Sequence, residues 1–279
     1  MNKKDFLYDP VTAIDEKKAT GKIAETFSDI RSTMNIPIVT SIWRGLADEN
    51  DSLFKIWNLA KPIYQCGLAE KTLKKMMNDI KLPLPEALAP SQLQCIHLNK
   101  SDIKNIQNII TVYNRSNGMN LMALSALVLY GPMLEKKKSL KNTGSILKDK
   151  LPELMNKEDI KPEAWTIIKH VNSLGSSSGI SSHVATLWRH LAYWPSFLAL
   201  VYSAFMPLQS DGKIDISLNA TLNYVKNNGI KTKYNSINNI NINKRVLKIL
   251  EGYVHTPNQV VRMVVIGHSM EKWLSNYRY

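Results

Sequence analysis

The chain has 279 residues, of which 44% are hydrophobic and 21% are charged, a composition typical of a folded globular protein with a sizeable core. Its longest uncharged apolar stretches, residues 119–134 and 193–208, fall short of the roughly 20 residues that span a bilayer, so we expect no membrane partner. The net charge of +13 comes from lysines spread among acidic residues without a nucleic-acid-binding motif, which makes nucleic acid a weak alternative partner. Residues 1–10 carry charges with no apolar run behind them, so we expect no signal peptide and a cytoplasmic protein.

Hydrophobic residues recur at helical spacing along almost the whole chain, and no convincing alternating strand pattern is present. Ile23, Phe27 and Ile30, for example, form a single apolar stripe. The sequence therefore predicts an all-α fold. The predicted helices cover residues 17–34, 38–47, 91–97, 101–113, 119–134, 244–252 and 259–274, with breaks at residues 83–90 and 255–258.

Prolines and polar residues mark further predicted helix ends. One helix begins in the polar turn at residues 48–51 and is expected to end at Pro62, because proline cannot donate the next backbone hydrogen bond. A later helix has Pro195 in its first turn and is expected to end at Pro207 for the same reason. The polar stretch at residues 114–118 is predicted to form a kink between two helices.

Residues 41–62 are repeated, without a gap, by residues 186–207. A repeat of about half the chain length predicts one helical unit that was duplicated and fused, packed as an internal pseudo-dimer with a two-fold axis. The residues that recur with a spacing of 145 are Trp43, Arg44, Leu46, Ala47, Leu53 and Pro62, which match Trp188, Arg189, Leu191, Ala192, Leu198 and Pro207.

The repeat predicts the domain organisation. We expect a first helical repeat at residues 1–134, a polar and lysine-rich linker at residues 135–161, and a second repeat at residues 162–279. A small-molecule site is expected near the seam between the two repeats. The sequence leaves open whether the pseudo-dimer associates further into a homo-oligomer.

Two polar features allow both a structural and a functional interpretation. Arg44 and Arg189 either pair with neighbouring carboxylates or hold a substrate carboxylate, for which the planar guanidinium is suited. Asn117 either caps the following helix or presents an amide that orients a water or a substrate oxygen. Two cysteines, Cys66 and Cys95, and six histidines show no metal-ligand spacing, so we expect no metal.

The helical layout, the tandem repeat and two short motifs resemble the group I 2-haloacid dehalogenases. The resemblance implies an alkylhydroperoxidase-D-like helical fold and a cofactor-free hydrolase, in which a carboxylate activates a water that displaces halide from a small α-halocarboxylic acid. The residues that carry the resemblance are Leu191, Ala192, Trp194, Pro195 and Leu198 in one motif and Asn114 and Asn117 in the other.

Carried over by this resemblance, the pocket asparagine of the family corresponds to Asn117, whereas the place of the catalytic aspartate is taken by Leu187. Leucine cannot take a proton, and losing a general base costs on the order of 10²–10⁴ in rate. His183 or His190 could replace the base, and His190 lies three residues further along the same helix face. We therefore expect Asn117 and His190 as catalytic residues. The expected substrate-binding residues are Ile38, Ser41, Asn114, Asn120, Thr186, Leu187 and His255.

Three functions remain open from the sequence. The first is a divergent hydrolase of a small (halo)carboxylic acid, and the second is a non-catalytic relative that binds a small molecule such as an organic acid. The third is a basic interaction protein whose partner is a nucleic acid or an acidic protein, which predicts binding that weakens steeply with salt.

Overall fold

The computed structural model describes residues 11, 13–49, 51–133, 151–177, 179, 184–232 and 242–275, and within these ranges the chain is helical and contains no strand. This confirms the all-α class. No helix in the described ranges is both long and apolar enough to cross a bilayer. In chain order the elements are η1 (Glu16–Lys18), α1 (Gly21–Met34), α2 (Ser41–Leu46), α3 (Ser52–Gln65), α4 (Leu68–Asp79), α5 (Pro90–Cys95), α6 (Lys100–Tyr130), η2 (Lys157–Asp159), α7 (Pro162–Val171), α8 (Thr186–His190), η3 (Leu191–Tyr193), α9 (Pro195–Ser210), α10 (Lys213–Asn228), α11 (Lys244–His255), η5 (Pro257–Val261) and α12 (Arg262–Ser275).

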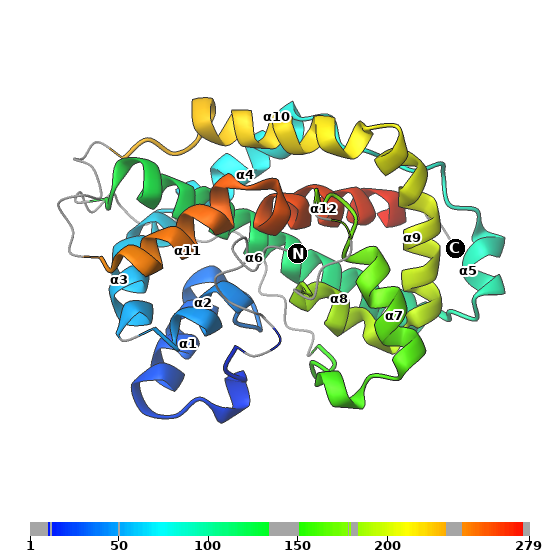
Figure 1. Cartoon of the computed structure of the whole chain (residues 1–279), viewed down its shortest axis with the longest axis horizontal. Coiled ribbons are helices and arrows are strands. Elements are labelled where there is room, and N and C mark those ends of the chain that lie inside the picture. Colours follow the sequence, from blue (N-terminus) through cyan, green and yellow to red (C-terminus); the bar gives the residue numbers. More distant parts are fainter. Residues whose placement is uncertain are drawn as a thin grey trace.

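The helix α6 runs through the middle of the molecule, with α1 to α3 on one side and α7 to α9 on the other (Figure 1). It packs against α3, α4, α8, α11, α12 and η5. Between Ile109 and Leu127 every residue of α6 is buried except Thr111 and Arg115. This helix is therefore the centre of one continuous hydrophobic core to which both predicted repeats contribute.

The predicted kink at residues 114–118 is wrong, because α6 continues through it as one helix of 31 residues. Tertiary contacts override the weak helix propensity of these polar residues and glycine. A Cβ atom on Gly118 would collide with the Leu73 side chain, so the glycine lets α4 pack closely against α6. Asn117 therefore lies inside a helix and caps no helix end, and the Asn114 side chain donates to Glu271 of α12.

The predicted helix ends at Pro62 and Pro207 are also wrong, since α3 continues to Gln65 and α9 to Ser210. Each proline lies in the last turn, where it removes one backbone hydrogen bond near an end that frays in any case. The break around residues 255–258 is confirmed: α11 ends at His255, and the π-helical turn η5 that follows has a non-helical backbone at Gln259. The helices α4, α7 and α10 were not predicted.

The order of helices is compatible with the predicted duplication, which remains a prediction. Helix α2 starts at Ser41 and α8 starts 145 residues later, at Thr186. Helix α4 follows Gly67 and α10 follows Gly212, and these two glycines have nearly the same left-handed backbone, with φ of 72° and 71°. Most of the predicted linker at residues 135–161 lies outside the described residues, which resume at 151.

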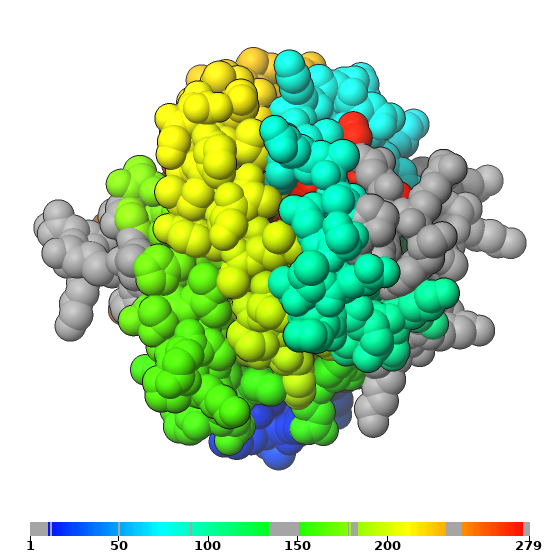
Figure 2. All heavy atoms as spheres, turned by 90° about the vertical axis from the view of Figure 1, so that its right-hand side faces the viewer, coloured from blue at the N-terminus to red at the C-terminus, as the bar shows by residue number. Residues whose placement is uncertain are grey.

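Helix α9 lies alongside the chain around α5, at the end of the molecule shown in Figure 2. The Trp194 indole Nε1 donates to the Asp102 carboxylate over 2.9 Å, and Ser196 Oγ donates to the Ile96 carbonyl over 3.3 Å. These hydrogen bonds join residues from the two predicted repeats, so the two halves are in contact along this side as well as across α6.

Candidate functional site

The seam site lies where α6 faces α2 and α8. One face of α6 carries polar side chains at positions related by three or four residues, namely Tyr113, Ser116, Asn117 and Asn120. All four are buried. Side chains from the start of α2 and from the end of α8 meet this face, so residues far apart in the sequence converge there.

Asn120 is the centre of a buried hydrogen-bond network. Its Oδ1 accepts from Trp43 Nε1 over 3.2 Å and from the Tyr64 hydroxyl over 2.9 Å. Its Nδ2 donates to Thr40 Oγ1 over 2.9 Å, and Ser116 Oγ donates to the same hydroxyl oxygen over 3.3 Å. Because the amide is satisfied on both sides, this arrangement orients α2 and α3 against α6.

Arg44 connects the two halves at the seam. Its Nη2 donates to Thr186 Oγ1 at the start of α8 over 3.4 Å, and its Nη1 donates to the Ile14 carbonyl over 3.3 Å. Arg44 and Thr186 are both buried. A guanidinium beside a hydroxyl is a combination suited to binding a carboxylate.

His190 has hydrogen-bond partners at both ring nitrogens. Nε2 lies 2.7 Å from the Pro152 carbonyl, which can only accept, so Nε2 carries the proton. Nδ1 therefore accepts from the Tyr113 hydroxyl, 3.2 Å away. Burial lowers the pKa of His190, the nearby Arg189 lowers it further, and the hydrogen bond to Pro152 opposes them. The neutral ring is thus fixed in a single tautomer.

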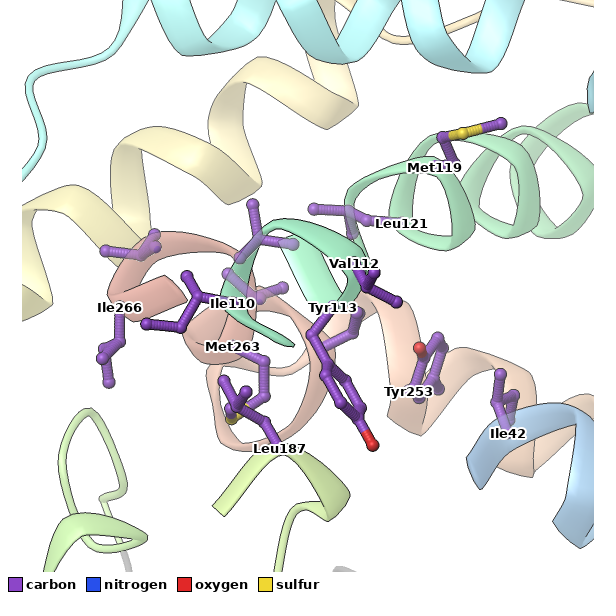
Figure 3. Packing of buried hydrophobic residues seen from close by; sticks show 14 of the residues in the cluster. Ile42, Ile110, Val112, Tyr113, Met119, Leu121, Leu187, Tyr253, Met263 and Ile266 are labelled. Atoms are coloured by element: carbon purple, nitrogen blue, oxygen red, sulfur yellow. The ribbon is translucent and has the colours of Figure 1, made fainter. Parts of the chain in front are cut away.

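Leu187, at the place of the family's carboxylate, is buried in the hydrophobic core. Figure 3 shows its side chain beside Met263 of α12, with Tyr113 of α6 close by. The sequence from Leu174 to Phe205 contains no Asp or Glu, so no neighbour on this segment supplies the missing carboxylate.

Glu16 brings a carboxylate to the seam that the sequence did not reveal. Its Oε1 accepts from the Val39 backbone over 2.6 Å and its Oε2 from Arg31 over 2.8 Å. Burial raises the pKa of Glu16, while the Val39 hydrogen bond and the charges of Arg31 and Arg44 oppose that rise. No local pattern around Glu16 signals this role, because its partners lie 15 and 23 residues further along the chain.

Tyr113 shows that the seam charges share one neighbourhood. Burial raises the pKa of its hydroxyl, while the positive charges of Arg44 and Arg189 oppose the rise and Glu16 adds to it. Two arginines and one carboxylate thus act on the same buried phenol. Among the charges that act on Tyr113, the two arginines outnumber the one carboxylate.

The other predicted site residues are distributed as follows. Ile38 and Ser41 are half-buried at the entry to α2, and Asn117 is buried on the seam face of α6. His255 is exposed at the end of α11, and Asn114 faces α12 on a different side of α6. The structure therefore groups Thr186, Leu187 and His190 around the seam and separates Asn114 from them. The roles assigned to all these residues remain predictions.

A cavity of about 450 Å³ lies on the other side of α6, between α4, α6 and α12. Burial raises the pKa of Glu70 in its wall, but hydrogen bonds and charges from Arg115 and Lys74 outweigh burial and hold that pKa below its usual value. Burial lowers the pKa of His268. Across the described ranges, no group of three or more His, Cys, Asp or Glu side chains is arranged to hold a metal ion. The cavity is lined by Glu70, Leu73, Lys74, Met77, Asn78, Thr111, Asn114, Arg115, Met119, His268 and Glu271.

Comparison with known proteins relates the fold to one group of enzymes. No protein-family model matches the chain, and no curated protein matches it in sequence. A mutant D-2-haloacid dehalogenase superimposes with a TM-score of 0.70 at 12% identity, covering 93% of this chain and 94% of that chain. A mutant in complex with D-2-CPA gives 0.66 at 11% identity over 92% and 94%, and the enzyme in complex with L-LA gives 0.63 at 12% identity over 92% and 95%. The chain therefore has the helical fold of the D-2-haloacid dehalogenases.

Proposed function

We propose that this protein binds a small carboxylic acid at the seam and does not dehalogenate it hydrolytically. The observation that carries the proposal is the pairing of Arg44 with Thr186 across the two halves, at a seam where two arginines and one carboxylate act on Tyr113. A ligand carboxylate would accept from the Arg44 guanidinium and the Thr186 hydroxyl in place of their mutual hydrogen bond. The D-2-haloacid dehalogenase complexes with D-2-CPA and L-LA support a small acid as the ligand class.

The two described positions considered for a base, Leu187 and His190, support binding rather than hydrolysis. Leu187 has no proton-accepting group, and both nitrogens of the predicted replacement, His190, are held by Tyr113 and Pro152. A general base must reach the water that it activates. His190 would first have to release one of these two partners.

A second candidate function is hydrolysis with Glu16 as the base. The observation that favours it is a half-buried carboxylate with a raised pKa, close enough to interact with both Arg44 and Tyr113. Against it, Val39 and Arg31 already donate to its two oxygens. The assay below separates the two candidates.

The test measures binding and chemistry side by side. Calorimetric titration with each enantiomer of 2-chloropropionate is expected to show binding by the wild type and about tenfold weaker binding by Arg44→Gln, because one charge-assisted hydrogen bond is lost. Arg245→Gln is the matched control, since Arg245 is exposed and pairs with Glu49 at the surface. Circular dichroism of each variant verifies that it is folded.

Halide release from 2-chloropropionate and 2-bromopropionate is expected to be absent in the wild type. Release by the wild type would contradict the proposal, and its loss in Glu16→Gln would then identify the base. Equal affinity of wild type and Arg44→Gln would contradict binding at the seam. Release by Leu187→Asp alone would show that the seam accepts the substrate and lacks only the carboxylate.

A further inference from the structure

The cavity between α4, α6 and α12 is separate from the seam because it uses the opposite face of α6. Thr111, Arg115 and Met119 of α6 line it, whereas Tyr113 and Asn117 on the same helix face the seam. Residues two apart on a helix point about 160° away from each other. A volume of about 450 Å³ is within the usual range of pockets for small ligands.

Glu271 is the charged group of this cavity that has no cationic partner. Its Oε1 accepts from the Thr111 hydroxyl over 2.6 Å and its Oε2 from Asn114 Nδ2 over 2.7 Å. Both donors are neutral, and among the described residues no basic side chain forms an ion pair with Glu271. Each carboxylate oxygen retains a lone pair that can accept another hydrogen bond.

The facing wall carries one carboxylate, Glu70, which is already paired with two cations. Glu70 Oε1 lies 3.0 Å from Lys74 Nζ, and its Oε2 accepts from Arg115 Nη2 over 3.1 Å. Arg115 is held in addition by its Nε, which donates to the Met34 carbonyl over 2.9 Å. Both carboxylate oxygens of Glu70 are thus engaged by cations, and Glu271 is the carboxylate of the cavity that forms no ion pair among the described residues.

His268 and Asn114 add acceptors next to Glu271. His268 Nδ1 lies 2.8 Å from the Val264 carbonyl and must donate to it, so in the neutral ring Nε2 is an acceptor. His268 precedes Glu271 by one helical turn, and both line the cavity. Asn114 is 2% exposed, and its Oδ1 has no hydrogen-bond partner among the described residues.

We propose that this cavity binds a small molecule with a primary ammonium group, which donates to Glu271 and His268 while its hydrocarbon part packs on Leu73, Met77 and Met119. An ammonium has three donors and no acceptor, which matches a wall of acceptors that includes one carboxylate without an ion pair. The three apolar side chains lie on the lining of the same cavity. Neither the seam nor its chemistry is needed for this binding.

Calorimetric titration of the full chain with butylammonium chloride tests the proposal, with sodium butyrate as the matched anion. We expect saturable binding of butylammonium by the wild type and about tenfold or greater weakening in Glu271→Gln, which keeps the shape of the side chain and removes its charge. Glu163→Gln, at an exposed carboxylate in the first turn of α7, is expected to bind as the wild type does.

Met77→Trp provides a second variant that leaves Glu271 in place and fills the cavity, and it is expected to abolish binding. It keeps the proposal testable if Glu271→Gln melts at a much lower temperature. The proposal is overturned if butylammonium does not bind at millimolar concentration, if butyrate binds equally well, or if folded Glu271→Gln and Met77→Trp bind with wild-type affinity.

Discussion

Asn120 illustrates how a polar residue can be recognised from the sequence while its environment cannot. It was expected to bind substrate, yet its amide bonds three buried groups, Trp43, Tyr64 and Thr40. These partners lie 77, 56 and 80 residues away along the chain. No local sequence pattern indicates contacts between residues so far apart in the chain. That these side chains meet at Asn120 is therefore seen only in the folded molecule.

Asn120→Ala is expected to lower the free energy of unfolding by about 2–4 kcal/mol, because it leaves the buried donors of Trp43 and Tyr64 without an acceptor. Urea unfolding followed by tryptophan fluorescence measures the change. Asn219→Ala, at an exposed position of α10, is the control and is expected to change stability by less than about 0.5 kcal/mol. A similarly small effect at Asn120 would show that the network contributes little.

His190 makes stability depend on pH in a defined direction. Because its folded-state pKa is lowered, the unfolded chain binds the proton more readily, and stability falls as the pH drops through the unfolded value of about 6.5. Between pH 7.5 and 5.5 we expect His190→Gln to lose less stability than the wild type, by on the order of 1 kcal/mol. Urea midpoints at the two pH values measure this, with His97→Asn at an exposed site as the control. Parallel pH profiles of wild type and His190→Gln would refute the assignment.

At the scale of helices, the sequence predicted the fold class and several helix positions well. The start of α11 and the break after it follow from periodicity and from Pro257, which are local signals. The continuity of α6 does not follow from local signals, because the bonds and contacts that maintain the helix through Asn114 and Gly118 come from α4 and α12. The cavity was missed for the same reason, since its walls come from three separate helices.

The close approach of α6 and α12 predicts that the effect of Gly267→Ala on stability changes sign when the Asn114 side chain is removed. A Cβ on Gly267 would collide with Asn114 Oδ1, so Gly267→Ala is expected to destabilise the protein by about 1–2 kcal/mol despite the higher helix propensity of alanine. In an Asn114→Ala background the collision is absent, and the same substitution is expected to stabilise by up to about 1 kcal/mol. Thermal unfolding of the four proteins measures the coupling. Additive effects would show that Asn114 moves aside freely.

At the scale of the whole molecule, the predicted duplication connects two tryptophans with different environments. Trp43 donates to Asn120, whereas Trp188 Nε1, its counterpart, is buried without a partner among the described residues. The position 145 residues after Asn120 is occupied by Val265. If the halves are related by a two-fold axis, an amide at Val265 would reach the Trp188 indole.

Both valines are fully buried, so an asparagine at either position is expected to destabilise the protein. Val265→Asn is expected to be less destabilising than Val264→Asn by at least about 1 kcal/mol, because only the amide at position 265 gains a hydrogen-bond partner. Chemical denaturation of the two variants makes the comparison. Equal costs would indicate that the second half no longer retains the geometry of the first.

The central position of α6 also determines whether the protein unfolds in parts or as a whole. Its middle is enclosed by α4, α11 and α12 together, so no predicted half can detach without exposing it to water. Amide protons in the core of α6 should then exchange with solvent only through complete unfolding, at a rate set by the global stability. Separate melting of two fused units is not expected, and calorimetry should record one cooperative transition. A gene fusion that began as two units would thus have become, thermodynamically, one.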